Sequence, residues 1–333
     1  MKNKGIQVNE ISEKTKASFK VRVITAAVIA AIGIPSIILG DWFFAAFFLI
    51  VACIAIYEFI HVLHNQKHFI WIDVFTFIMT ISFIYWFMIK QQLSSSGSII
   101  DEANHIMFND IGISTLGIAF TTCTLFFGSM LTKKFNVPDV CYYLTMSILV
   151  TLGIQSMYFL RYVPISPLSE SAPGFKYDGN YMYSCFLFVY FVIGTCMTDI
   201  GAYAVGILFG KHKVNPRISP NKTWEGFYGG IAISFLFSFT FGLLISYFNI
   251  PLLKGILDFE HWYWILLISL VMPIASVLGD FIFSAIKRYY DIKDFSNALP
   301  GHGGILDRID SILISGIFVT IIILTIAHFP FFS

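Results

Sequence analysis

The residues best suited to chemistry lie in one charged stretch of the chain, from residue 280 to residue 310. It combines carboxylates, amines, guanidinium groups, one imidazole and closely spaced glycines, and long apolar runs flank it on both sides. Charged groups beside a membrane are costly unless water solvates them or a function uses them. We therefore expect a reactive site here. Its candidate residues are Asp280, Ser284, Lys287, Arg288, Lys293, His302, Gly303, Gly304, Asp307, Arg308 and Asp310.

The spacing of Asp307 and Asp310 predicts a cation site. Residues three apart share one face of a helix, so the two carboxylates would repel each other at a membrane edge. A divalent cation removes that repulsion, and oxygen ligands favour magnesium or manganese. Asp280, near the end of the preceding apolar run, can approach the same point. The alternative interpretation is a basic loop whose aspartates pair locally with neighbouring cations.

The other side chains of this stretch suit a phosphorylated ligand. Cationic groups at Lys287, Arg288, Lys293 and Arg308 can neutralise phosphate oxygens. Glycines at 301, 303 and 304 let the backbone come close to a ligand. For His302 three roles stay open: contact with phosphate, proton transfer, or support of the glycine turn.

A second group of candidates lies upstream, from residue 198 to residue 226. Asp199 falls inside an apolar run, where an acid usually faces a cavity or the bundle interior. The segment 219–223 predicts a hydroxyl-rich turn with one amine that opens a helix and suits phosphate. The same segment also fits a simple helix N-cap. The candidates are Asp199, Ser219, Lys222 and Thr223, and the glycines at 201, 206 and 210 are as easily explained by helix packing.

The composition indicates a membrane protein. Of 333 residues, 57% are hydrophobic and 12% are charged, whereas an ordinary soluble domain carries about 25% charged residues. A spanning helix needs about 20 apolar residues. We predict an all-α, polytopic transmembrane bundle of about nine spans, at 22–40, 43–63, 70–89, 112–132, 140–160, 182–209, 227–248, 262–286 and 308–329.

The distribution of cationic residues predicts the topology. With the N-terminus inside, 17 of the 21 lysines and arginines fall in inner segments, as the positive-inside rule requires. The first run is too long for a signal peptide, and no cleavage site follows it, so we expect an uncleaved helix. We divide the chain into a cytoplasmic tail (1–21), N-terminal transmembrane helices (22–180) and a catalytic transmembrane region with cytoplasmic loops (181–333). We expect a multi-pass protein of the cell inner (plasma) membrane whose site faces the cytoplasm.

The charged stretch resembles a known family signature. It reads Ser284-x2-Lys287-Arg288-x4-Lys293-Asp294-x-Ser296-x2-Leu299-Pro300-x-His302-Gly303-Gly304-x2-Asp307-Arg308-x-Asp310, which is similar to the signature of the phosphatidate cytidylyltransferases, or CDP-diacylglycerol synthases. Upstream, Asp199, Ala202-Tyr203 and Ser219-Pro220-x-Lys222-Thr223-x-Glu225-Gly226 also resemble that family. The resemblance covers a third of the chain, from 198 to 310, and the first five spans match only in being apolar.

The resemblance implies a reaction of phospholipid biosynthesis in which CTP and phosphatidic acid give CDP-diacylglycerol and pyrophosphate. It implies catalytic roles for Asp280, Lys287, Arg288, His302, Asp307, Arg308 and Asp310, and substrate-binding roles for Asp199, Ser219, Lys222, Thr223, Ser284, Lys293, Gly303 and Gly304. Asp280, Asp307 and Asp310 would hold Mg²⁺, and a second, monovalent cation such as K⁺ is associated with this site. The bilayer would supply the lipid. We expect no nucleic-acid partner, and a homodimer is one assembly open to such a protein.

Three other functions compete with this one. A CTP-dependent polyprenol or phytol kinase would transfer the γ-phosphoryl group instead, and the full signature argues against it. An ion-coupled transporter could use Asp199 and Asp280, but the paired broken helices of such proteins are not evident. A CDP-alcohol phosphotransferase is excluded because its Asp-Gly-x2-Ala-Arg run does not occur.

Overall fold

The protein is a bundle of long helices. The structure, a computed structural model, describes residues 13–64, 70–95, 113–162, 184–215, 217, 219–299 and 303–328. The described elements are α1 (Glu13–Leu39), α2 (Asp41–His64), α3 (Ile70–Ser95), α5 (Ile113–Leu131), α6 (Val137–Tyr162), α8 (Ser184–Phe209), β1 (Lys213–Asn215), β2 (Ser219–Thr223), α9 (Trp224–Tyr247), α10 (Trp262–Tyr289) and α11 (Leu306–His328). Each predicted apolar run corresponds to one of these helices, so the predicted helical bundle is confirmed.

Six of the described helices are long and apolar enough to cross a membrane: α2, α6, α8, α9, α10 and α11. The other three contain shorter apolar segments, at Ala27–Leu39, Ile70–Tyr85 and Gly117–Leu131. The count of about nine spans therefore stays a prediction. The first helix begins at Glu13, inside the segment that we expected to form a tail.

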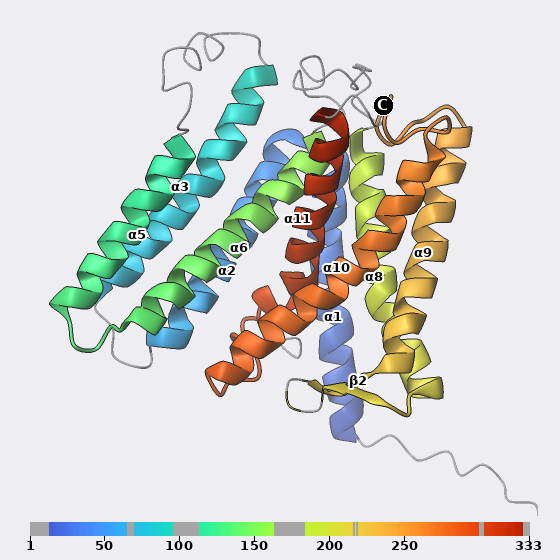
Figure 1. Ribbon diagram of the computed structural model, residues 1–333. Helices are drawn as coiled ribbons and strands as arrows, with labels where there is room; N and C mark the ends of the chain where they lie inside the picture. Colours follow the sequence, from blue (N-terminus) through green and yellow to red (C-terminus); the bar gives the residue numbers. More distant parts are fainter. Residues whose placement is uncertain are drawn as a thin grey trace, which may run out of the picture.

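The central helices of the bundle are α6, α10 and α11. Figure 1 shows α3 and α5 at one side, α8 and α9 at the other, and α6, α10 and α11 between them. Packing contacts join α11 to both α10 and α6, and join α6 to α2 and α3. The C-terminal half of the sequence is thus in direct contact with the N-terminal helices.

Among the described helices, α8 and α9 make the most extensive contact, and glycines allow their backbones to approach closely. A Cβ atom on Gly201 would lie 3.2 Å from the Cα atom of Gly230, and one on Gly226 would lie 2.7 Å from the carbonyl oxygen of Ala202. Backbones can pack this closely only where no side chain intervenes. Helix packing therefore accounts for Gly201, and it brings the start of α9 against α8.

The segment 219–223 is a strand and not the turn that we expected. It forms β2, which pairs antiparallel with β1 in the register Lys213–Thr223 and Asn215–Ser219. The predicted helix start directly after it is confirmed, because the hydroxyl of Thr223 accepts a hydrogen bond from the Gly226 N–H at 3.2 Å and caps α9. The sequence did not predict this strand because β2 contains proline and asparagine, which are depleted in strands.

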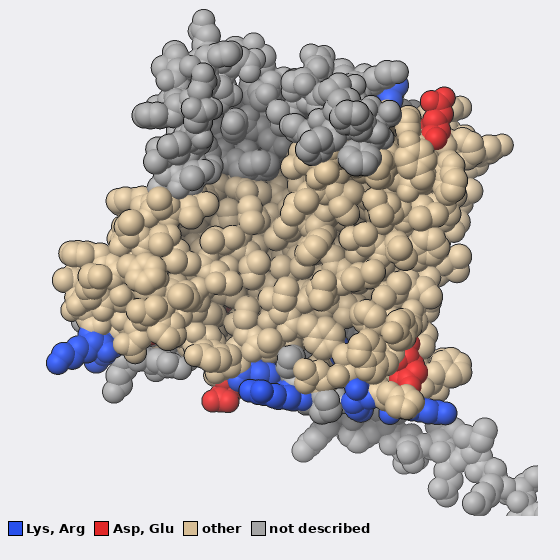
Figure 2. Space-filling view, in the orientation of Figure 1, with Lys and Arg blue, Asp and Glu red and all other residues tan. Residues whose placement is uncertain are grey.

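One end of the bundle collects the cationic side chains. Figure 2 shows lysine and arginine side chains along the end that carries the β1–β2 hairpin and the α10–α11 connection. The connections α5–α6, α8–β2 and α10–α11 contain the exposed lysines Lys133, Lys134, Lys211, Lys213 and Lys293. Both predicted functional segments therefore lie at the same, positively charged end.

Candidate active site

The C-terminal half of α10 carries one polar face. Asp280, Ser284 and Lys287 are spaced at i, i+4 and i+7, so they lie on one side of the helix. Lys287 is also in the last turn, where the helix dipole favours a positive charge. This side of α10 faces α11, which packs beside it.

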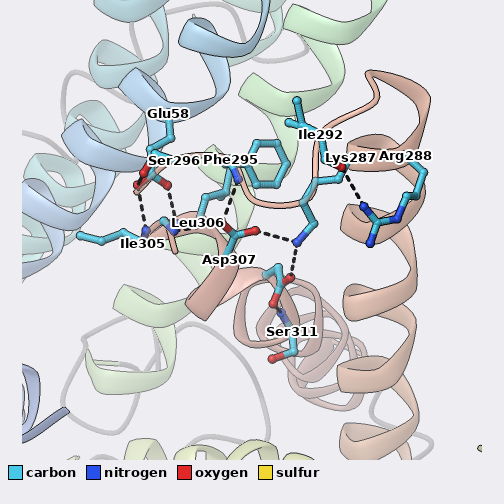
Figure 3. A network of polar contacts seen from close by, with 12 residues as sticks. Glu58, Lys287, Arg288, Ile292, Phe295, Ser296, Ile305, Leu306, Asp307 and Ser311 are labelled. Carbon is cyan, nitrogen blue, oxygen red and sulfur yellow. Dashed lines mark hydrogen bonds and ion pairs between the residues drawn. The ribbon is translucent and has the colours of Figure 1, made fainter. Parts of the chain in front are cut away.

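Lys287 joins α10 to the two aspartates of α11. Its Nζ atom lies 2.6 Å from Oδ1 of Asp307 and 3.9 Å from Oδ2 of Asp310 (Figure 3). All three side chains are nearly buried, with 10% of Lys287, 3% of Asp307 and 7% of Asp310 exposed. Asp307 and Asp310 therefore share one face of α11, as predicted, and both face the amine of Lys287.

Asp307 organises the loop that precedes α11. Its Oδ2 atom accepts hydrogen bonds from the N–H groups of Phe295 at 2.9 Å and Gly304 at 3.0 Å, while Oδ1 takes the Lys287 bond. Gly303 adopts a φ of 83°, a conformation that disfavours any other residue. Each oxygen of Asp307 therefore has a protein donor, which suits a role in orienting the site.

A second carboxylate, Glu58, also binds this loop, and it was not identified from the sequence. Glu58 on α2 is fully buried, and it accepts bonds from the Ser296 hydroxyl at 2.6 Å and from the N–H groups of Ile305 at 2.8 Å and Leu306 at 2.7 Å (Figure 3). The only sequence signal was a lone acid in an apolar run, and nothing local to α2 indicated its partners. An acid in such a run is a functional candidate by default.

Lys222 and Asp280 form the second ion pair of the site. The Lys222 Nζ atom lies 2.5 Å from Oδ2 of Asp280 and 4.8 Å from the centre of the Phe281 ring. Both side chains are partly exposed, and both line a pocket of about 420 Å³ between α8, α9, α10 and the hairpin. Asp199, Tyr203 and Thr223 line it as well. The upstream candidates therefore share one cavity with Asp280 of the downstream group.

The two ion pairs are close neighbours at the crossing of α10 and α11. A Cβ atom on Gly279 would lie 2.9 Å from the carbonyl oxygen of Asp310, so the two helices touch beside Asp280. Asp280 is near enough to interact electrostatically with both Asp199 and Asp310, and Arg308 interacts in the same way with Asp199. Acidic and basic groups from α8, α10, α11 and β2 thus surround one point.

The remaining predicted site residues lie around this centre. The Arg288 guanidinium, exposed at the end of α10, donates to the carbonyl oxygen of Ile292 at 2.9 Å. Lys293 and Arg308 are exposed, while Ser219 and Ser284 are half-buried. His302 lies outside the described residues, so its three possible roles stay open.

The site offers separated carboxylates with lysine partners. Among the described residues, no three histidine, cysteine or acidic side chains converge as a ready metal site. Asp280 and Asp310 have fewer protein donors: Lys222 binds Oδ2 of Asp280, the Ser311 N–H binds Oδ1 of Asp310 at 2.8 Å, and Lys287 is 3.9 Å from Oδ2 of Asp310. These two carboxylates suit a magnesium ion that uses one or two carboxylates and completes its shell with phosphate oxygens. Asp307 fits less well as a ligand, because protein donors engage both of its oxygens.

Comparison with known proteins identifies the family. Residues 20–326 match the model of the Cytidylyltransferase family. The phosphatidate cytidylyltransferase of Bacillus subtilis is 36% identical over 212 residues, which cover 63% of this chain and 69% of that protein. The phosphatidate cytidylyltransferase of Staphylococcus saprophyticus is 31% identical over 296 residues, covering 88% and 95% of the two chains. The chain therefore belongs to the cytidylyltransferase family.

Proposed function

We infer that this membrane protein is a phosphatidate cytidylyltransferase, which converts CTP and phosphatidic acid into CDP-diacylglycerol and pyrophosphate. The observation that carries the inference is the pocket between α8, α9, α10 and the hairpin. It places Lys222, Asp280 and Asp199 in a cavity that also has apolar walls. Such a cavity suits both a nucleoside triphosphate and a lipid headgroup. The relatives named above carry this activity in their names.

The chemistry requires positioning and charge neutralisation. An oxygen of the phosphatidate phosphate attacks the α-phosphorus of CTP, a new P–O bond forms, and the bond to the β-phosphate breaks as pyrophosphate leaves with the electron pair. A phosphate monoester is already anionic at neutral pH, so no strong general base is needed. Lys222 in the pocket and Lys287 behind it supply positive charge to the phosphate oxygens.

Asp280 and Asp310 would hold Mg²⁺, which would supply charge neutralisation at the reacting phosphates. Asp307 would orient the site through its bonds to Lys287, Phe295 and Gly304. A monovalent cation such as K⁺ stays a prediction that rests on the resemblance. In this proposal Lys222 exchanges Asp280 for phosphate when the substrates arrive, while Lys287 keeps its bond to Asp307.

The charged end of the bundle faces the cytoplasm in this proposal, and the protein resides in the cell inner (plasma) membrane. The support is the excess of cationic residues at the end that carries the site (Figure 2). CTP would enter from that side. The bilayer would deliver phosphatidic acid by lateral diffusion.

Labelled CTP tests the reaction directly. Detergent-purified protein is incubated with phosphatidic acid, Mg²⁺ and CTP that carries label in either the α- or the γ-phosphate. We expect the α-label in a lipid product and the γ-label in pyrophosphate. Transfer of the γ-label to a lipid would indicate a kinase, and the absence of any lipid product would leave the transporter hypothesis.

The metal assignment is tested by a matched pair of variants. Asp310→Asn removes one charge beside Asp280 and should lower turnover by about a hundredfold or more, a loss of about 2.7 kcal/mol in transition-state stabilisation. Asp294→Asn makes the same chemical change at an exposed position of the loop and should be mild. Turnover is measured against Mg²⁺ concentration. A near-normal rate and Mg²⁺ dependence in Asp310→Asn would show that this aspartate only balances Lys287.

A further inference from the structure

We propose that Glu58 is a positioning residue of the active site: its carboxylate holds the N-terminus of α11, and thereby Asp307 and Asp310, in register. The proposal rests on the roles given above to these two aspartates. Glu58 comes from α2, in the half of the chain that the motifs do not cover. It is 0% exposed, so it acts without touching a substrate.

The three partners of Glu58 lie in the connection between α10 and α11 and at the first residue of α11. Two are the N–H groups of Ile305 and Leu306, at 2.8 and 2.7 Å, and the third is the Ser296 hydroxyl at 2.6 Å. The first N–H groups of a helix have no partner within the helix. A carboxylate at that end satisfies them and also interacts favourably with the helix dipole.

Glu58 and Asp307 bind neighbouring N–H groups of residues 304–306 from different sides. Asp307 binds the N–H of Gly304, and Glu58 binds the next two N–H groups along the chain (Figure 3). Three consecutive amides are thereby fixed by two carboxylates, one from the motif and one from α2. Any shift of this turn moves Asp307, and with it the Lys287 pair.

Glu58 lies so close to Gly304 that a side chain at position 304 would collide with it. A Cβ atom added at Gly304 would lie 2.6 Å from Oε2 of Glu58 and 2.9 Å from its Oε1. Three hydrogen bonds and complete burial keep the carboxylate from moving aside. The glycine is therefore required by Glu58, and a shorter acid at position 58 would make room for a methyl group.

Hydrogen–deuterium exchange of the substrate-free protein tests the contact itself. Peptides that cover residues 303–310 should exchange about tenfold faster or more in Glu58→Gln, because the amide puts an NH₂ group where an acceptor is needed. The matched control is Asp73→Asn on α3, another buried carboxylate, which accepts a hydrogen bond from the Tyr143 hydroxyl at 2.6 Å. It should leave exchange of these peptides unchanged.

The same variants test the catalytic consequence. Glu58→Gln should lower kcat by about ten- to a hundredfold, the equivalent of a charged hydrogen bond, while the KM for CTP changes little because Lys222 is untouched. Asp73→Asn should retain kcat. Unchanged exchange in Glu58→Gln would overturn the proposal whatever the activity, and altered exchange with normal kcat would reduce Glu58 to a structural cap.

A double-mutant cycle keeps the proposal testable if Glu58→Gln does not purify. Glu58→Asp and Gly304→Ala should each lower kcat, and the double variant should retain more activity than the product of the two losses, since the shorter acid accommodates the added methyl group. Losses that simply multiply would contradict the proposed contact.

Discussion

Replacement of Lys287 by methionine should destabilise the protein far more than the same replacement at an exposed site. Methionine keeps the length of the side chain and removes its charge, so Asp307 and Asp310 are left without their common counter-ion. Breaking a buried ion pair by removing one partner costs about 3–5 kcal/mol. Asp307 retains two N–H donors, at 2.9 and 3.0 Å, which places our expectation near about 3 kcal/mol, the lower end of that range.

The matched control is Lys293→Met, which removes the same charge from an exposed position of the following loop. An exposed charge contributes about 0–1 kcal/mol. The free energy of unfolding of both variants is measured in mixed micelles by titration with SDS. Turnover is followed in parallel, and we expect it to be nearly lost in Lys287→Met.

The outcome that would refute this reasoning is a similar loss of stability in the two lysine variants. A second check is the double variant of Lys287→Met with Asp307→Asn. Removing both charges relieves the unpaired carboxylate, so the double variant should be more stable than the sum of the single effects predicts, by about 1–3 kcal/mol. Additive effects would mean that the amine and the carboxylate do not depend on each other.

Three further predictions address the substrate, the topology and the pH dependence of stability. Lys222→Ala should reduce turnover or CTP affinity about ten- to a hundredfold in steady-state kinetics, since it removes a charged phosphate contact. A cysteine introduced by Asn297→Cys should resist an impermeant thiol reagent added outside sealed cells, because that loop is predicted to be cytoplasmic. Partial burial tends to raise the pKa of Asp258, but hydrogen bonds from His261 and a backbone N–H outweigh it and hold the pKa below its usual value. A depressed pKa stabilises only while the carboxyl is ionised, so stability should fall between about pH 5 and pH 3 more steeply than in Asp258→Asn.

The helices and the downstream site were predictable because their signals are local. Apolar runs of sufficient length define the helices, and the helical repeat places Asp307 and Asp310 on one face. The same repeat aligns Asp280 with Lys287 along α10. What the repeat does not give is the partner of each charge. The pairing of Lys222 with Asp280 joins residues 58 positions apart in the chain, and it depends on how β2 and α10 pack.

Two features escaped prediction for different physical reasons. The strand β2 is stabilised by pairing with β1, which outweighs the poor strand propensity of its own residues. The role of Glu58 depends on contacts with residues 238 to 248 positions away, so no window of the sequence contains them. Asp307 was predicted as a metal ligand, a role that remains untested, and its protein donors favour an orienting role instead.

Gly304 shows how a distant residue can determine the composition of a local motif. From the sequence, we expected Gly303 and Gly304 to serve one purpose, the close approach of backbone to a ligand. In the structure they differ: Gly303 is needed for its positive φ of 83°, and Gly304 is needed because the Glu58 carboxylate occupies the space of a side chain. The second glycine is therefore explained by α2 and not by the substrate. It follows that the N-terminal helices do more than fill the membrane, since one of them supplies an acceptor without which the turn before Asp307 would have unsatisfied N–H groups.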